Sequence, residues 1–240
     1  MVSVKAFIIG ATGLVGNGFY KEADKSKVFS NIFTLTRRDL LTKSYSNKTT
    51  SIIEKNSENW DSIIKDTITK EKIDIFFSGL ATTKKEANGF DNQYKIDHDL
   101  NLQLAKVAKE SGVGTYILIS SMGANKDSSL SYLKMKGKLD DEVIDLKFPR
   151  TIIIRPGVLV GQRDKGKDKG LFNNVVLFIG EKVHGTFLNN LMYPIYDYEI
   201  GKIVVDLIEK TPIPADDEPE VTILNPTQLS EILKNIESNR

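Results

Sequence analysis

The sequence contains no cysteine, and only two histidines, His98 and His184, occur among its 240 residues. Without cysteine there can be no disulfide bond and no thiolate metal ligand. Two histidines are also too few for a histidine-based metal site. We therefore predict that the protein holds no metal.

The charges show no excess of either sign, since 33 basic and 32 acidic residues leave a formal net charge of +1. A surface that binds nucleic acid normally shows a basic excess, so we predict no nucleic-acid partner. No run approaches the roughly 18 apolar residues of a membrane-spanning helix. Because residues that read as folded structure begin at position 4, we also expect no removable presequence.

Short apolar, β-branched runs recur along the chain with helical stretches between them. They are continuous rather than alternating, which is typical of strands buried on both faces of a parallel sheet. Between them, residues 97–109 place Leu100, Leu104, Val107 and Ala108 on one side of a helix. The predicted fold class is α/β, a doubly wound, mostly parallel sheet (Rossmann fold) in a single domain, 1–240. The predicted strands are 4–9, 32–36, 50–54, 73–78, 115–120, 151–155 and 220–224.

The stretch "IIGATGLVG" places Gly10, Gly13 and Gly16 directly after the first predicted strand and at the start of a helix. Glycines in such a turn let the backbone approach a pyrophosphate, whose charge the free N–H groups at the helix end can hold. A glycine turn without a ligand is the alternative. The position at the first strand–helix junction favours dinucleotide binding.

The second predicted strand ends in "TLTRRDL", where a dinucleotide-binding protein often carries an acidic residue for the adenosine ribose. Here Arg37 and Arg38 occupy that zone, and Asp39 comes late. Guanidinium groups bind a 2′-phosphate, which a carboxylate would repel. The sequence therefore favours NADP (NADPH) over NAD, with an ordinary solvated strand end as the alternative.

The chemistry of the site is predicted from Tyr132 and Lys136, four residues apart on a predicted helix, and from the serines that close the strand 115–120. Residues four apart share one face of a helix. A tyrosine acid or base needs its pKa of about 10 lowered, which a neighbouring ammonium and a positive nicotinamide ring would do. A serine hydroxyl would orient a substrate carbonyl. Ser121 is preferred over Ser120 for this role, although the sequence leaves both open.

A second pair with the same spacing, Tyr198 and Lys202, follows no strand-ending serine. We interpret it as a chance match.

These motifs together resemble the short-chain dehydrogenase/reductase superfamily, in its atypical branch. Within that branch the chain is more similar to the fungal proteins found in the mitochondrial proteome than to the mammalian Tat-interacting oxidoreductase. The resemblance covers nearly the whole chain. It is carried by "GATGLVG", "SGLATT", "QYKIDHDLNLQLAKVAKESG", "SSMGA", "YLKMKGKLDDEVI" and "RPGVLVGQR".

The resemblance implies a catalytic group of Ser121, Tyr132 and Lys136 and a small carbonyl or alcohol as substrate. It also implies a peripheral place on the cytosolic face of the mitochondrial outer membrane, with the cytoplasm as the alternative. Residues 156–240 would supply the substrate side, including the loop 162–171 and the segment 187–197. The implied cofactor contacts are Gly10, Thr12, Gly13, Leu14, Val15 and Gly16 along the pyrophosphate, Arg37 at the 2′-phosphate, Leu80, Ala81 and Thr82 under the adenosine and ribose, and Pro156, Gly157 and Val158 at the nicotinamide amide.

Two residues depart from the family pattern. Asp97 stands where related extended enzymes usually carry an asparagine, and Asn56 stands where an acidic residue is common near the adenine. Two other functions stay open beside the oxidoreductase. One is a dinucleotide-binding sensor or adaptor that acts through a protein partner, and the other is an isomerase or epimerase of nucleotide sugars.

Overall fold

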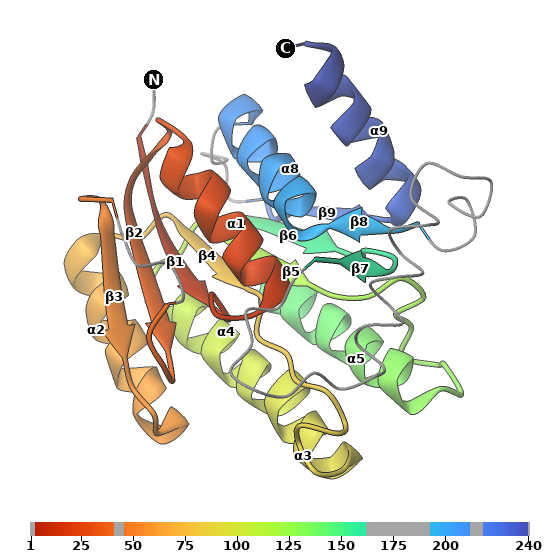
Figure 1. Ribbon diagram of the computed structural model, residues 1–240. Coiled ribbons are helices and arrows are strands. Elements are labelled where there is room, and N and C mark those ends of the chain that lie inside the picture. The colour runs from red at the N-terminus through yellow and green to blue at the C-terminus, as the bar shows by residue number, and fades with distance from the viewer. Residues whose placement is uncertain (1–2, 41–45, 162–192, 212–217, 240) are drawn as a thin grey trace.

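The computed structural model describes residues 3–40, 46–161, 193–211 and 218–239. Seven parallel strands form one sheet in the order β3-β2-β1-β4-β5-β6-β9, which confirms the predicted doubly wound architecture (Figure 1). Each predicted strand is found; the second begins at Phe29 rather than at residue 32. The strands are β1 (Val4–Ile9), β2 (Phe29–Thr36), β3 (Thr49–Ile53), β4 (Ile75–Ser78), β5 (Thr115–Ile119), β6 (Arg150–Ile154) and β9 (Glu220–Leu224).

Aromatic side chains hold the centre of the sheet together. Phe7, Phe76 and Tyr116 are register partners on β1, β4 and β5. Their rings stack in series, with centroids 5.4 Å and 5.5 Å apart. All three side chains are fully buried. Stacked aromatic pairs stabilise a core beyond the apolar area that they remove from water, so this row ties the middle strands to one another.

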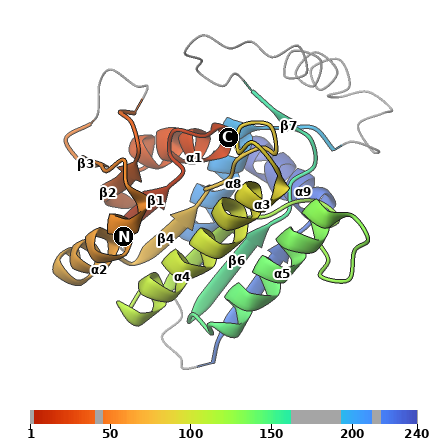
Figure 2. The same ribbon diagram turned by 90° about the horizontal axis from the view of Figure 1, so that it is seen from below.

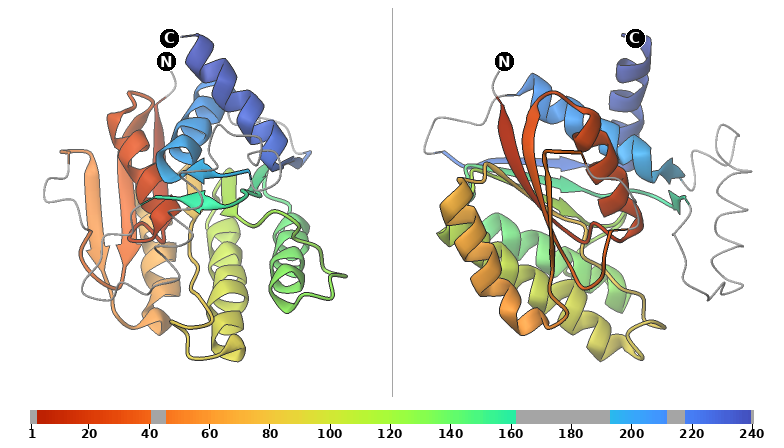
Figure 3. Two further views of the ribbon diagram at one scale, coloured as in Figure 1. Left: turned by 45° about the vertical axis from the view of Figure 1, so that its right-hand side comes forward. Right: turned by 60° about the vertical axis from the view of Figure 1, so that its left-hand side comes forward.

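Helices cover both faces of the sheet (Figures 1 and 3). On one face α2, α4 and α5 lie beside one another, as the view from below shows (Figure 2). On the other face lie α1, α8 and α9. Each face has its own buried apolar cluster, as a doubly wound fold requires. The helices are α1 (Leu14–Lys25), α2 (Trp60–Glu71) with the 3₁₀ turn Ser57–Asn59 before it, α3 (Phe90–Tyr94), α4 (Asn101–Glu110), α5 (Ser131–Asp145), α8 (Asp197–Lys210) and α9 (Pro226–Ser238).

The predicted helix 97–109 differs from an ordinary α-helix. Lys95–Leu100 is a π-helical segment, and α4 begins only at Asn101. A π turn adds a residue to the turn and changes which side chains face inward, and such turns are frequent at functional sites. Here Asp97 and His98 are buried. The pattern of leucines could not show this, because the same apolar face continues through the segment.

A small second sheet was not predicted. It pairs β7 (Leu159–Val160) with β8 (Ile195–Tyr196) in parallel. The expected substrate-side loop 162–171 lies outside the described residues, and so does most of the segment 187–197.

Candidate functional site

The candidate site lies where the strands end at their carboxyl edge. β1 and β4 are neighbours at the centre of the sheet, and the strand order reverses between them. Ligands of doubly wound sheets bind in the crevice at such a switch point. The glycine turn follows β1 and residues 79–82 follow β4, while Ser120 follows β5 and Pro156 comes soon after β6. The structure therefore brings the predicted segments to one edge.

The glycine turn after β1 is packed backbone against backbone. Gly10 has a φ of +78°, and a Cβ there would lie 2.4 Å from the carbonyl carbon of Gly79. A Cβ on Gly16 would lie 2.2 Å from the carbonyl oxygen of Gly10. These contacts explain why glycine stands at both positions.

The N-terminal end of α1 is open to an anion. Gly13 is its N-cap residue, no side chain caps it, and its first turn holds no acidic residue. The first N–H groups of a helix have no partner within the helix, so here they can hold a pyrophosphate. Val15 is buried, which leaves its backbone as the part that could contact a ligand. The residues present thus fit the pyrophosphate of a dinucleotide.

Arg37 and Arg38 are exposed at the end of β2. Thr36 holds the turn by donating its hydroxyl to the carbonyl of Arg38, at 2.7 Å. Neither guanidinium makes an ion pair with a described residue. Both are therefore available to a phosphate beside the carboxyl end of β2.

The segment after β4 is held by polar side chains from the π-helical segment and α4. The carboxylate of Asp97 accepts the N–H of Thr82 at 2.6 Å, and the side-chain amide of Asn101 donates to the carbonyl of Leu80 at 2.9 Å. Ser78 donates its hydroxyl to Asn101 in turn. Asn101 was not singled out from the sequence, although an asparagine on the apolar face of a helix was a usable signal. Asn56, the other departure, caps the 3₁₀ turn by accepting the N–H of Glu58 at 3.1 Å.

Lys136 is almost completely buried, with 2% of its surface exposed. Its ammonium donates to the carbonyl of Ile119 at 2.9 Å. Burial lowers the pKa of Lys136, and the carboxylates of Asp97 and Asp140 partly offset this. Burial conversely raises the pKa of the Asp97 carboxyl, which the N–H of Thr82 and the charge of Lys136 partly offset. Lys136, Asp97 and Asp140 thus form a buried cluster of ionisable side chains.

Tyr132 is the second residue of α5, and 41% of its surface is exposed. Burial around its hydroxyl raises its pKa, the charge of Asp97 raises it further, and the nearby hydroxyl of Ser121 partly offsets both. The predicted lowering of this pKa involved both Lys136 and a nicotinamide ring, and the protein by itself does not produce it. The hydroxyls of Ser121 and Tyr132 nevertheless lie near each other, although that of Ser121 donates to the carbonyl of Met122, at 3.3 Å.

The two serines after β5 differ in their surroundings. Ser120 is buried and donates its hydroxyl to Asp140 at 2.8 Å. The Nε of Arg155 donates to the same carboxylate at 2.9 Å. Ser121 is only half-buried and lies beside Tyr132. The structure thus favours Ser121 as the residue that faces a substrate, and it shows a Ser120–Asp140–Arg155 network that the sequence analysis missed.

The segment after β6 lies next to this group. Met122 donates its N–H to the carbonyl of Pro156 at 2.9 Å, and Ile195 of β8 donates to the carbonyl of Val158 at 2.9 Å. Residues 156–158 therefore connect the loop that carries Ser121 to the small second sheet.

One contact between helices also escaped the sequence analysis. His98, on the π-helical segment, lies with its Nε2 3.0 Å from a carboxylate oxygen of Glu142 on α5 and its Nδ1 2.9 Å from Asp99. The ring of Tyr94 stacks on it, with centroids 4.5 Å apart. This contact links the segment that carries Asp97 to the helix that carries Tyr132 and Lys136.

The second pair with the Tyr132–Lys136 spacing lies elsewhere. Tyr198 and Lys202 are on α8, where the ammonium of Lys202 lies 4.9 Å from the centre of the Tyr198 ring. This is a cation–π contact.

Among the described residues, no group of three or more His, Cys, Asp or Glu side chains could hold a metal ion. Over the same residues, the helices lack the length and apolar character needed to cross a lipid bilayer.

The strand order and the glycine turn after β1 are those of a doubly wound, dinucleotide-binding type of fold. Solved structures support this fold. A short-chain dehydrogenase family protein from Francisella tularensis matches with a TM-score of 0.61 at 12% identity, over 95% of this chain and 100% of that one. UDP-glucuronic acid 4-epimerase from Bacillus cereus, solved with UDP-glucuronic acid and NAD, matches with a TM-score of 0.63 at 13% identity, over 98% of this chain and 83% of that one.

The chain belongs to the FMP52 family. Protein FMP52-1, mitochondrial, of Scheffersomyces stipitis is 41% identical over 97% of this chain and 100% of its own length. Protein FMP52, mitochondrial, of Saccharomyces cerevisiae is 40% identical over 87% of this chain and 89% of its own length. No family model matches the chain.

Proposed function

We propose that the protein is an NADP-dependent oxidoreductase of the atypical short-chain dehydrogenase/reductase type. The observation that carries this proposal is that Ser121, Tyr132 and the buried Lys136 all lie at the carboxyl edge of the sheet, after β5 and in the first turns of α5. The substrate is a small carbonyl compound or the corresponding alcohol. A bound nicotinamide would supply or accept the hydride.

Residues of the chain would transfer the proton and orient the substrate. Tyr132 donates a proton to the carbonyl oxygen in reduction and accepts it from the alcohol in oxidation. Ser121 donates a hydrogen bond to the same oxygen and orients it. Because the pKa of Tyr132 is raised, the phenol form dominates at neutral pH, which favours the proton donor needed for carbonyl reduction.

The cofactor contacts follow the predicted residues. Gly10, Gly13 and Gly16, with the N–H groups around Thr12, Leu14 and Val15, are proposed to hold the pyrophosphate. Leu80, Ala81 and Thr82 would lie beneath the adenosine and ribose, and residues 156–158 would meet the nicotinamide amide. The neighbour from Bacillus cereus was solved with NAD, which supports a nicotinamide dinucleotide. The exposed, unpaired Arg37 and Arg38 support NADP in particular.

A second function, a dinucleotide-binding sensor or adaptor, is favoured by one observation. A tyrosine that acts as a base needs a lowered pKa and a charged lysine beside it. Here the pKa of Tyr132 is raised and that of Lys136 is lowered. In such a protein the nucleotide site would control the binding of a protein partner.

We further propose a mitochondrial location, as a peripheral protein on the cytosolic face of the outer membrane. The names of the relatives, which include the word mitochondrial, support the organelle. Attachment to the outer membrane can be tested by fractionation and alkaline extraction of purified mitochondria.

The test of the proposed function compares cofactor binding with turnover. NADPH and NADH binding is measured by titration, and carbonyl compounds are screened with the wild type and with Tyr132→Phe. Tyr198→Phe is the matched control, because Tyr198 is similarly exposed and also stands four residues before a lysine. Turnover lost only in Tyr132→Phe supports the oxidoreductase. Tight NADPH binding with no turnover that depends on Tyr132 would instead support the sensor.

A further inference from the structure

A cavity of about 200 Å³ lies between α9 and β8. Its walls come from β8, from the first turn of α8 and from α9. Gly157, three residues after the end of β6, also lines it. Ser121, Tyr132 and Lys136 do not line it. The cavity is thus separate from the catalytic group, and its size suffices for a small organic molecule, since an apolar cavity of about 150 Å³ can bind benzene.

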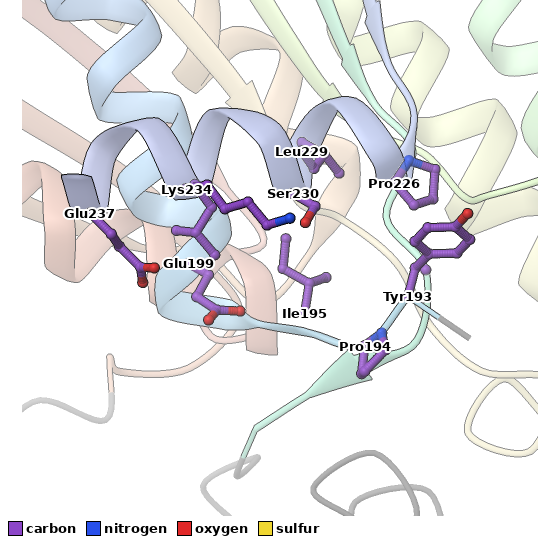
Figure 4. A pocket seen from close by; sticks show the side chains of 11 residues that line it. Tyr193, Pro194, Ile195, Glu199, Pro226, Leu229, Ser230, Lys234 and Glu237 are labelled. Carbon is purple, nitrogen blue, oxygen red and sulfur yellow. The ribbon is translucent and has the colours of Figure 1, made fainter. Parts of the chain in front are cut away.

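One side of the cavity is apolar. Leu229 and Leu233 lie one turn apart on α9. Ile195 of β8 lies opposite Leu229 (Figure 4). Leu229 is 1% exposed and Ile195 is 6% exposed. Pro194 and Pro226 extend this surface. The apolar part of a ligand would find its contacts here.

The other side carries a hydroxyl and an ammonium that have no hydrogen-bond partner among the described residues. Ser230 and Lys234 are four residues apart on α9, so they share one face of the helix. The ammonium of Lys234 extends toward the Ser230 hydroxyl (Figure 4). Neither side chain makes a hydrogen bond or an ion pair with a described residue. A hydroxyl and an ammonium on one face can bind an anion by charge-assisted hydrogen bonds.

Two carboxylates also line the cavity, and one of them, Glu237, lies three residues after Lys234 on α9. Glu199 accepts the N–H of Tyr196 at 2.8 Å, in the first turn of α8, where the positive end of the helix stabilises its charge. Glu237 is exposed in the last turn of α9. In Figure 4 both carboxylates lie nearer to the C-terminal end of α9 than the Ser230 hydroxyl does. The end of the cavity near Ser230 and Lys234 is therefore the end that suits a negative charge.

We propose that this cavity binds a small organic monocarboxylate with a short apolar body. Ser230 and Lys234 bind the carboxylate, and the apolar body lies against Ile195, Leu229 and Leu233. No residue of the catalytic group takes part in the site, but the cavity adjoins the proposed cofactor site at Gly157. It also includes Tyr193, Pro194 and Ile195, from the segment predicted for the substrate side.

The experiment compares three probes that share one apolar body: hexanoate, hexan-1-ol and hexylammonium. Binding to the full chain is measured by ligand-observed NMR titration without any dinucleotide. Hexanoate is expected to bind saturably and more tightly than the other two. Lys234→Met should weaken hexanoate about tenfold or more, because a charge-assisted hydrogen bond is lost. Ser230→Ala should weaken it less.

Lys106→Met is the matched control, because Lys106 is an exposed lysine on α4 outside the cavity. It should leave the affinity for hexanoate unchanged. Lys234 is exposed, so its substitution should leave the melting temperature near that of the wild type. Equal affinity for hexanoate and hexan-1-ol, tighter binding of hexylammonium, no saturable binding, or unchanged binding in Lys234→Met would overturn the proposal. Because dinucleotide is left out, each of these results is independent of whether the oxidoreductase proposal holds.

Discussion

The hydroxyl of Ser120 donates a 2.8 Å hydrogen bond to the buried carboxylate of Asp140 on α5. The same carboxylate accepts from Arg155, which follows β6. Ser121 instead lies beside Tyr132. Because successive side chains of an extended chain point to opposite sides, two adjacent serines can have different tasks. Ser120 connects β5, α5 and the end of β6, whereas Ser121 faces the candidate site.

Alanine at each serine should separate these tasks. Ser120→Ala removes a donor from a buried carboxylate and should lower the free energy of unfolding by about 1–3 kcal/mol. Ser121→Ala should change stability by no more than about 0.5 kcal/mol but reduce kcat roughly a hundredfold or more. Urea unfolding and steady-state kinetics check the pair. Equal stability of the two variants would contradict the assignment of Ser120 to the network with Asp140.

Arg37→Ala should weaken the binding of NADPH much more than that of NADH. The side chain is exposed beside the end of β2, where a 2′-phosphate would lie. Loss of a charge-assisted hydrogen bond corresponds to about a ten- to hundredfold rise in Kd. Fluorescence titration measures both dinucleotides. Lys65→Ala, at an exposed lysine on α2, is the control. If NADPH and NADH weaken equally, Arg37 does not contact the 2′-phosphate.

Gly10→Ala and Gly112→Ala form a matched pair, because both glycines have a positive φ, +78° and +93°. A Cβ at Gly112 meets nothing within 4 Å, so only the backbone conformation is strained. That strain costs about 1–2 kcal/mol. A Cβ at Gly10 also overlaps the backbone of Gly79, which adds about 1–3 kcal/mol. Chemical denaturation should show the larger loss of stability in Gly10→Ala, and NADPH binding should be lost in that variant alone. A similar loss of stability in both would show that the turn relaxes.

Asp97→Asn should change how stability depends on pH. Burial raises the pKa of Asp97 above its ordinary value of 3.8. The folded protein therefore holds this proton more tightly than the unfolded chain. Its contribution to stability is present below pH 3.8 and is lost as the pH rises through the folded pKa. The variant has no such loss, so its free energy of unfolding should rise relative to the wild type as the pH rises above this value.

Removal of the Asp97 carboxylate also leaves the Lys136 ammonium less compensated. This lowers the pKa of Lys136 further and acts in the same direction, because charging the lysine then costs more at low pH. Urea unfolding at a series of pH values measures the difference. Asp127→Asn, in the loop before α5, is the control. A difference between Asp97→Asn and the wild type that stays constant with pH would refute the expectation.

The fold was predictable because its signals are local. Continuous apolar runs mark strands buried on both faces, and each predicted run is a strand of the sheet. The π-helical segment was not predictable in this way, because apolar periodicity does not separate a π turn from an α turn. The pairing of β7 with β8 was missed for a different reason: each strand has only two residues, too few to show a pattern.

The site was predictable in part. Motif and position predicted that Gly10 and Tyr132 lie at the carboxyl edge, and the structure places both there, Gly10 after β1 and Tyr132 on α5, while their functional roles stay predictions. Asn101, Asp140 and Arg155 were missed. Their importance depends on contacts across 15 to 23 positions in the chain, such as Ser78 with Asn101 and Arg155 with Asp140. Spacing along a sequence does not record such contacts.

The sequence by itself determined the strand–helix alternation, the glycine turn and the residue types placed at the carboxyl edge, because these depend on neighbours along the chain. Only the tertiary structure decided that Ser120 belongs to Asp140 while Ser121 belongs to Tyr132, and that the pKa of Tyr132 is raised. Both results depend on burial and on charges brought together from distant segments. Burial removes water from each of these groups, and a sequence motif does not indicate how far each group is buried.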